Sequence, residues 1–444
     1  MTTTLIQRVQ LRFKSVLARV LGVAAIAAVL LPLDAQALPS FARQTGQNCV
    51  ACHAGGQYPE LTPYGRMFKM TGYTIGERTI PISAMGVVSS ASISNPPDGT
   101  QKNARPVFAT GSVFLAGKIT DNIGAFAQFT YDNYAVDNGD GTFSGHTAAD
   151  NMDFRFADHI VGDKQDWIYG VSVNNNPSIS DPWNSAAAWM QYVPISSLSS
   201  HQFVDGKAPY PKFGSGGNIA GVTAYMFWNK TLYLETGAFG TADGAVSFMR
   251  SGIDDSSKTK LSGTNPYWRL ALSHEWGPHN VMVGMSGMTA KVWDGGSDTS
   301  DPGNLGQFRN NGLDVQYQYI LDPHTFTAQF GYMEQKQTYS DNAGGAPGLT
   351  DMNNILRAKA SYIYSAKYGG SLAYFSQTGT TNVQGDPSTS GVSYEAFFIP
   401  VQNIRLGAQY TTYNKYGGAS NNYDGAGRNA SDNNSLFVYA WFAY

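Results

Sequence analysis

Apolar and polar residues alternate with a period of two in short segments from about residue 79 onward. In the segment 313–321, Leu313 and Val315 fall on one face, while Asp314 and Gln316 fall on the other. Successive side chains of a β-strand point to opposite faces, so this pattern predicts strands with one apolar face. The same alternation occurs in the segments 123–132 and 404–411.

Short and long connections alternate between these segments. The tight ones lie at 120–122, 162–164, 229–230, 277–279, 322–323, 366–367 and 401–402. The long ones are rich in Gly, Asn, Asp and Ser and run roughly over 133–150, 177–216, 242–265, 294–310, 338–353, 379–390 and 415–433. An up-and-down barrel of the outer membrane has tight periplasmic turns and long outer loops. A sandwich or a propeller gives no reason for this asymmetry.

The pattern therefore predicts an all-β fold over residues 79–444, a transmembrane antiparallel barrel of about 16 strands. Both ends of the barrel would face the periplasm, and lipid of a bacterial outer membrane would surround it. The last alternating segment, 436–444, ends in a terminal aromatic residue and resembles the C-terminal signal by which such barrels are recognised for assembly.

Composition agrees with membrane strands. Only 14% of the 444 residues are charged, 13% are aromatic and 49 are glycine. The formal net charge is −3, so no basic surface indicates a nucleic-acid partner. The sequence contains no phosphate-binding loop, catalytic triad or H-E-x-x-H motif.

Residues 1–37 have the layout of an export signal. Arg8 and Arg12 belong to a positive region, and an apolar stretch over 20–33 follows it. That stretch is short for a membrane span, and Ala35 and Ala37 supply a small-x-small cleavage site. We expect a mature chain that begins at Leu38. The alternative is an uncleaved N-terminal anchor.

A C-x-x-C-H run follows the predicted signal. Cys49 and Cys52 are the only cysteines, and His53 comes directly after them. Thiols at this spacing can each add across a haem vinyl group, and the adjacent imidazole can bind the iron as its proximal ligand. A redox or disulfide C-x-x-C is one alternative. A zinc site is another, but it has no further cysteine to complete it. The run predicts one covalent haem c.

Within the predicted plug, residues 38–78, the haem-bearing segment runs from residue 38 to about 73 and is too short to enclose a haem alone, since chains below about 40 residues rarely form a self-sufficient core. A barrel of 16 strands encloses an open aqueous lumen. We therefore predict that this α/coil segment plugs the lumen from the periplasmic end. The alternative is a segment that hangs in the periplasm.

Further haem contacts are expected close to the run. Met67 or Met70 would be the distal iron ligand, or both would pack the segment against the barrel. A barrel histidine is a further option for the iron: His146, His159 or His201. Arg43, Arg66 and Lys69 would pair with the haem propionates or with lumen acids such as Asp132 and Asp314.

Residues 39–46 read Pro-Ser-Phe-Ala-Arg-Gln-Thr-Gly, and residues 59–73 read Pro-Glu-Leu-Thr-Pro-Tyr-Gly-Arg-Met-Phe-Lys-Met-Thr-Gly-Tyr. Around the C-x-x-C-H run, they resemble the N-terminal signature of the fused monohaem cytochrome c–porin family of bacterial outer membranes, which includes iron oxidases. The resemblance implies a redox protein that passes electrons from an extracellular donor, ferrous iron first among them, through one haem to a periplasmic carrier.

Other functions remain open from the sequence. One is a diffusion porin in which the haem segment is a structural or regulatory plug, and another is a haem enzyme such as a peroxidase. Porins of this strand count are often trimers, so an oligomer is compatible with the sequence.

Overall fold

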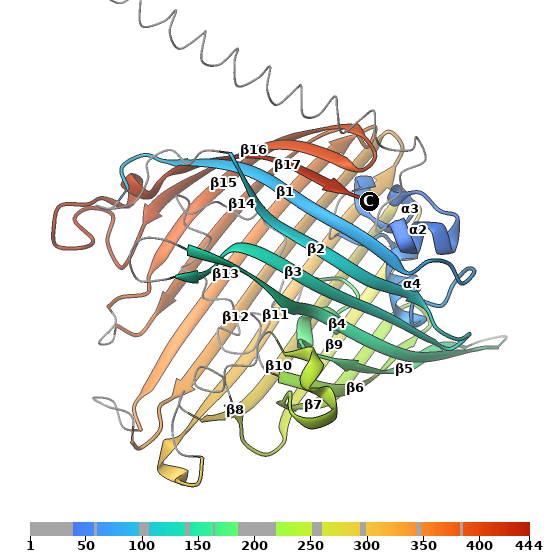
Figure 1. Ribbon diagram of the computed structural model, residues 1–444, viewed down its shortest axis with the longest axis horizontal. Coiled ribbons are helices and arrows are strands. Elements are labelled where there is room, and N and C mark those ends of the chain that lie inside the picture. Colours follow the sequence, from blue (N-terminus) through green and yellow to red (C-terminus); the bar gives the residue numbers. More distant parts are fainter. Residues whose placement is uncertain are drawn as a thin grey trace, which may run out of the picture. The chain divides into compact units, whose positions relative to one another are not determined.

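The structure is a computed structural model that describes residues 39–56, 60–96, 106–137, 143–162, 165–184, 219–250, 260–293, 299–342, 348–381 and 385–444. The predicted signal, residues 1–37, lies outside the described residues. Within these ranges the strands form one sheet that closes on itself (Figure 1). No helix of the described part is long and apolar enough to cross a membrane.

Consecutive strands pair antiparallel, and β1 pairs with both β2 and β17, which closes the barrel. β8 has only two residues and pairs with β10, the strand that also pairs with β9. Apart from β8, the described ranges contain 16 longer strands. The predicted barrel and its strand number are confirmed. The strands are β1 Ile82–Ile93, β2 Val107–Lys118, β3 Ile123–Asp137, β4 Phe143–Val161, β5 Asp166–Asn174, β6 Ile219–Trp228, β7 Leu232–Thr241, β8 Lys260–Leu261, β9 Asn265–Trp276, β10 His279–Trp293, β11 Leu305–Leu321, β12 His324–Thr338, β13 Thr350–Tyr364, β14 Tyr368–Gly379, β15 Thr389–Val401, β16 Ile404–Lys415 and β17 Ser435–Ala443.

The tight turns lie at one end of the barrel. Asn229 and Lys230, between β6 and β7, have φ of 47° and 53°, and Ser365 and Ala366, between β13 and β14, both have φ of 52°. Positive φ at both central residues is typical of the hairpin turn whose twist matches the flanking strands. The other predicted tight turns also fall at strand junctions, apart from residues 163–164, which are outside the described ranges.

Two predicted long connections are shorter than expected. Residues 133–150 contain the end of β3 and the start of β4, and β11 begins at Leu305 within the predicted loop 294–310. These strand ends are rich in polar residues. Beyond the apolar band both faces of a strand are wet, so the alternation of hydrophobicity no longer marks it.

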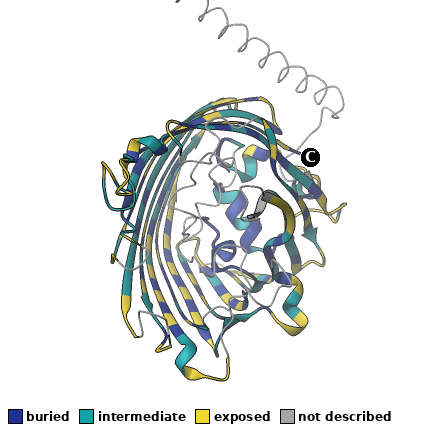
Figure 2. Ribbon diagram, turned by 60° about the vertical axis from the view of Figure 1, so that its left-hand side comes forward, coloured by how far each residue is buried: buried dark blue, intermediate teal, exposed yellow. Residues whose placement is uncertain are grey.

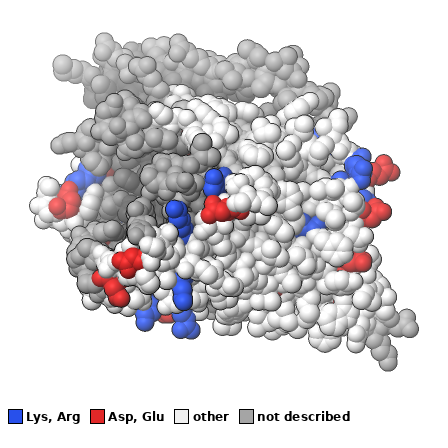
Figure 3. All heavy atoms as spheres, turned by 60° about the horizontal axis from the view of Figure 1, so that its bottom comes forward, with Lys and Arg blue, Asp and Glu red and all other residues white. Residues whose placement is uncertain are grey.

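The barrel wall is apolar outside and polar inside. In β11, Leu313 is 39% exposed, whereas the inward Asp314 and Gln316 are 2% and 1% exposed. Figure 2 shows these bands of buried and exposed residues along the strands, and Figure 3 shows a wall that is mostly uncharged between charged side chains near its ends. An apolar exterior around a closed barrel is a surface for lipid. The protein is therefore a porin-like barrel of the bacterial outer membrane.

The described residues of 39–73, namely 39–56 and 60–73, are here called the plug and lie within the barrel near the tight turns (Figures 1 and 2). Gln44 of the plug accepts from Lys118 N at 2.8 Å, beside the β2–β3 turn. The plug contains α2 Pro39–Thr45, α3 Cys49–Cys52, the 3₁₀ helix η1 Ala54–Gly56 and α4 Pro63–Met70. The predicted α/coil plug is confirmed. The other short helices are α5 Pro177–Ser180, η4 Gly244–Met249, η5 Pro302–Asn304 and η6 Ala430–Asn433.

The plug has a small aromatic centre that the barrel completes. The rings of Phe41 and Phe68 lie 4.9 Å apart, and Phe41 stacks on Tyr73 at 5.3 Å. Phe126 of β3 lies 6.4 Å from Phe41. The plug thus uses the wall as part of its own core, as its length requires.

Candidate functional site

The C-x-x-C-H run forms a single helical turn. Cys49 and Cys52 begin and end α3, and the His53 N–H donates to the Cys49 carbonyl oxygen at 2.8 Å. The two cysteines are not joined in a disulfide; Cys49 is buried and Cys52 half-buried. The two thiols and the imidazole therefore leave the backbone within one turn, as covalent haem attachment requires.

The chain after His53 folds back over this turn. Ala54 N donates to Glu60 O at 2.8 Å, and Thr62 N donates to Cys52 O at 2.9 Å. The Thr62 hydroxyl donates to Ala51 O and also caps α4 by accepting from Gly65 N. A Cβ at Gly65 would lie 2.1 Å from Cys52 O, so only glycine lets α4 pack this closely on α3.

Burial sets the protonation of the donor groups. It lowers the pKa of His53 to about 4, and burial followed by the charge of Cys49 raises the pKa of Cys52 to about 11. At neutral pH the imidazole is thus neutral, the form that binds a metal, and the Cys52 thiol keeps its proton. These three residues fit a covalently attached haem in both spacing and chemistry.

The haem motif faces one side of the wall. Gln402, in the β15–β16 turn, donates from Nε2 to Cys49 Sγ at 2.8 Å. η1 lies against β11 and β12, and a Cβ at Gly55 would meet Ile363 of β13 at 2.5 Å. Glu60 forms an ion pair with Lys359 of β13 at 2.7 Å. The motif and the chain after it therefore contact β11, β12, β13 and the β15–β16 turn.

Helix α4 directs its cations toward other strands. Arg66 donates to Gln318 Oε1 and Asn280 Oδ1, both at 3.0 Å, and lies 3.6 Å from Glu275. Lys69 donates to Asp181 O at 2.8 Å and Asn184 Oδ1 at 3.2 Å. Both cations are buried, Arg66 against the barrel wall and Lys69 against residues 181 and 184. A propionate contact for them stays a prediction.

The plug cations remain charged at neutral pH. Burial lowers the pKa of Arg66 to about 10, which Glu275 partly opposes. Burial and then the nearby Arg155 lower the pKa of Lys69 to about 8. In contrast to the buried Arg66 and Lys69, Arg43 is exposed. It donates to the carbonyl oxygens of Ile80 and Ile82 at 3.2 and 2.5 Å.

A second lumen segment, residues 175–184, meets the plug. The sequence placed residues 177–184 in an outer loop, and this prediction is wrong, because α5 and Trp183 are buried inside the barrel. Trp183 lies between the guanidinium groups of Arg66 and Arg269, at 5.9 and 6.0 Å. Large apolar residues in this connection, Ile179 and Trp183 among its described residues, were a sequence signal for this burial.

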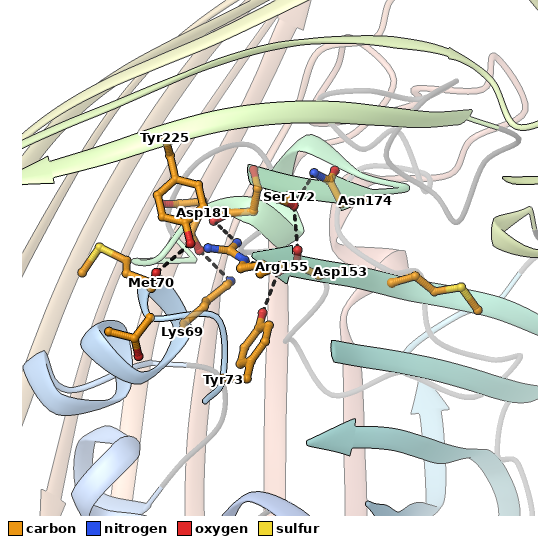
Figure 4. Close-up of polar contacts among 12 residues, drawn as sticks. Lys69, Met70, Tyr73, Asp153, Arg155, Ser172, Asn174, Asp181 and Tyr225 are labelled. Carbon is orange, nitrogen blue, oxygen red and sulfur yellow. Dashed lines mark hydrogen bonds and ion pairs between the residues drawn. The ribbon is translucent and has the colours of Figure 1, made fainter. Parts of the chain in front are cut away.

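Buried polar groups join this segment, the plug and the wall (Figure 4). The Tyr73 hydroxyl donates to Asp153 Oδ2 at 2.6 Å, and Asp153 pairs with Arg155 at 2.6 Å. Arg155 donates to Ser180 O at 2.7 Å, and the Tyr225 hydroxyl donates to Met70 O at 2.6 Å. The sequence had not indicated this network, whose members are far apart along the chain.

The candidate distal ligands lie on the same helix. Met70 is 2% exposed in a cluster with Trp183 and Tyr225, and Met67 packs against that cluster. This is the packing alternative, and iron ligation by either methionine stays a prediction. His146 and His159 are exposed on β4, and His201 lies outside the described residues. No group of three or more His, Cys, Asp or Glu side chains able to hold a metal ion occurs in the described part of the chain.

No model of a known protein family matches the sequence, and no curated protein matches it. Solved structures with a similar fold are outer-membrane channels. The Salmonella typhi OmpF complex with daunomycin is 12% identical, with 82% of this chain and 97% of that chain covered and a TM-score of 0.46. The outer membrane channel DcaP of Acinetobacter baumannii is 12% identical, with coverage of 82% and 96% and a TM-score of 0.44.

Proposed function

We propose that this protein carries one covalent haem c on its plug and transfers electrons across the outer membrane. The observation that supports this most is the C-x-x-C-H turn within the barrel, which contacts one side of the wall. Cys49 and Cys52 would each add an S–H across one vinyl double bond, forming a C–S and a C–H bond. His53 would bind the iron, with Met67 or Met70 as its distal ligand.

The location gives the electron a shorter path. The hydrocarbon core of a membrane is about 30 Å thick, and electron tunnelling falls steeply over such a distance. When bound, haem supplies a one-electron couple inside the barrel. The plug lies at the tight-turn end, where a periplasmic carrier would approach it, and the long connections lie at the opposite end, where an outer donor would enter.

The donor follows from the resemblance of residues 39–73 to the cytochrome–porin signature. Ferrous iron outside the cell would give up one electron and become ferric, and the periplasmic carrier would take up that electron. No proton or oxygen is required in this exchange. The protein would therefore act as an iron oxidase only together with a carrier.

A second function is supported by the lumen lining. Ser112, Thr130, Gln128 and Asn151 form a connected row of hydrogen bonds on inward positions of β2 to β4. Polar rows of this kind line aqueous channels. The alternative is therefore a diffusion porin in which the haem segment is a structural or regulatory plug.

One preparation tests both functions. Protein produced in a host with the cytochrome c assembly machinery is denatured and its haem absorbance measured, with Cys49→Ala/Cys52→Ala as the paired variant. We expect covalent haem in the natural protein and none in the variant. Anaerobic addition of ferrous iron to the oxidised holoprotein should then reduce the haem.

The outcomes separate the functions. Absence of covalent haem would reject both functions, since each includes it. Covalent haem that ferrous iron does not reduce, with solute entry in a liposome-swelling assay, would favour the porin. Reduction by ferrous iron in liposomes that stay closed to solutes would support the electron conduit.

A further inference from the structure

Three side chains form a donor group on the inner wall beside the haem motif. Gln329 of β12 and Lys359 of β13 are paired across the two strands and face the lumen. Arg357 is the next inward residue of β13. Gln329 and Arg357 are 6% and 2% exposed. We name these three residues the wall donors.

Strand β13 carries two of the wall donors and also contacts the plug beside the haem motif. Ile363 contacts Gly55, and Lys359 binds Glu60, so the inward residues of this strand follow the motif from the turn end into the lumen. Two residues of a strand advance about 6.7 Å. Arg357 therefore lies about 7 Å farther from the turn end along the strand than Lys359.

The wall donors have capacity for an anion. In the described part of the chain, Gln329 Nε2 is buried and has no hydrogen-bond partner. A buried amide N–H₂ group without an acceptor is unfavourable, and native structures rarely contain one. The Lys359 ammonium has three N–H donors and uses one for Glu60. An acceptor placed between these groups would satisfy both.

The charges of this wall point the same way. Arg405 of β16 pairs with Glu395 of β15 at 2.7 Å, and Lys359 pairs with Glu60. Arg357 adds a third cation to this stretch of the wall, on the same strand as Lys359. The plug cations Arg66 and Lys69 already bind oxygen acceptors elsewhere.

We propose that Arg357 and Gln329, with Lys359 beside them, bind the propionate groups of the haem. A guanidinium can bind a carboxylate through two parallel hydrogen bonds, and an amide N–H can bind a remaining oxygen. This inference rests on the proposed function, because it requires a haem on Cys49 and Cys52. It assigns the propionate contacts to the barrel wall and not to the plug.

A measurable consequence is electrostatic. A cation fixed next to a propionate offsets its negative charge, which favours the reduced iron, and it keeps the propionic acid ionised to lower pH. Loss of the cation should lower the midpoint potential. It should also move the pH range over which the potential depends on pH to higher values. A residue that only supports the fold would not produce the second change.

The experiment uses full-length holoprotein in detergent and redox titration monitored by haem absorbance at several pH values. The variants are Arg357→Gln, Arg357→Lys and Gln329→Leu. Arg309→Gln, exposed at the far end of β11, is the matched control. Heat-modifiable migration on gels reports barrel folding, and haem absorbance after denaturation reports covalent attachment.

We expect covalent haem in every folded variant. Arg357→Gln should lower the midpoint potential of the haem. The expected shift is about tenfold in the electron-exchange equilibrium with the mediator, toward oxidised haem, which is 59 mV for one electron. Arg357→Lys should keep most of the natural potential. Gln329→Leu, which removes one hydrogen bond, should produce a shift of about threefold. The pH dependence should move upward in Arg357→Gln only.

The inference is overturned if attached haem in Arg357→Gln and Gln329→Leu titrates as in Arg309→Gln. If Arg357→Gln does not fold, Gln329→Leu decides by itself. Absence of covalent haem from the natural protein would instead reject the proposed function, so the two failures are distinct.

Discussion

Arg66 is the best place to test how firmly the plug is held. Its guanidinium joins α4 to three wall residues: Gln318 and Asn280, both at 3.0 Å, and Gln316 at 3.4 Å. Arg66→Met keeps much of the side-chain length but removes every side-chain N–H donor. The change leaves the three buried amide oxygens of the wall without this donor, and the two shorter bonds are the main loss.

The size of the effect follows from these contacts. A hydrogen bond to a charged group contributes about 1.5 kcal/mol or more, so two such bonds give about 3 kcal/mol. Glu275 lies 3.6 Å away and is 39% exposed, so solvent screens it and it adds little. Because 1.4 kcal/mol is tenfold in an equilibrium, the population with a displaced plug should rise about 100-fold.

Two assays report plug displacement. Single-channel recording in planar bilayers measures how often the lumen opens, and limited proteolysis measures access to residues 39–73. Both should increase in Arg66→Met. Arg43→Met is the control, because in the described residues Arg43 donates to the backbone oxygens of Ile80 and of Ile82, at the start of β1, and both bonds are exposed to water, which weakens them. Equal channel opening and equal cleavage in the two variants would refute the view that wall contacts hold the plug.

Three further changes probe the same packing. Gly65→Ala should lower covalent haem content, because its Cβ would lie 2.1 Å from Cys52 O; Gly240→Ala, with nothing within 4 Å, is the control, and equal haem in both would contradict this. Tyr73→Phe removes the hydrogen bond to Asp153, which should lower the free energy of plug displacement by about 1 kcal/mol and so increase plug proteolysis about fivefold; unchanged cleavage would contradict it. Trp183→Ala should lower the thermal stability of the plugged state by about 3 kcal/mol, measured by calorimetry, and a change below about 1 kcal/mol would show that the Trp183 site is not tightly packed.

The strand pattern was predictable where lipid imposes it. Leu313 and Val315 face outward and Asp314 faces inward, as the alternation indicates, because a membrane strand needs one apolar face. The same rule fails at strand ends. The end of β3 and the start of β4 fall within 133–150, where the polar sequence resembles a loop.

The candidate site also has a part that the sequence predicts and a part that it does not. Cys49, Cys52 and His53 lie on one turn because their spacing is local, and the sequence alone identifies them. Arg66 and Lys69 are three residues apart on α4, so a helix must place them on one face. Which wall that face meets depends on how the helix is docked, and this information is not local.

The sequence by itself determined a barrel, an inner plug and a turn of chain suited to a covalent haem. These features depend on short-range periodicity, on the spacing of three residues and on chain length. Only the tertiary structure decided which wall residues surround that turn. Lys359 contacts Glu60 of the plug because strand register sets the depth of every inward side chain, and register is a property of the closed sheet. Gln402 contacts Cys49 because the turn between β15 and β16 lies beside the plug. The segment around Trp183 entered the lumen for a related reason: its burial depends on partners from the plug and from distant strands.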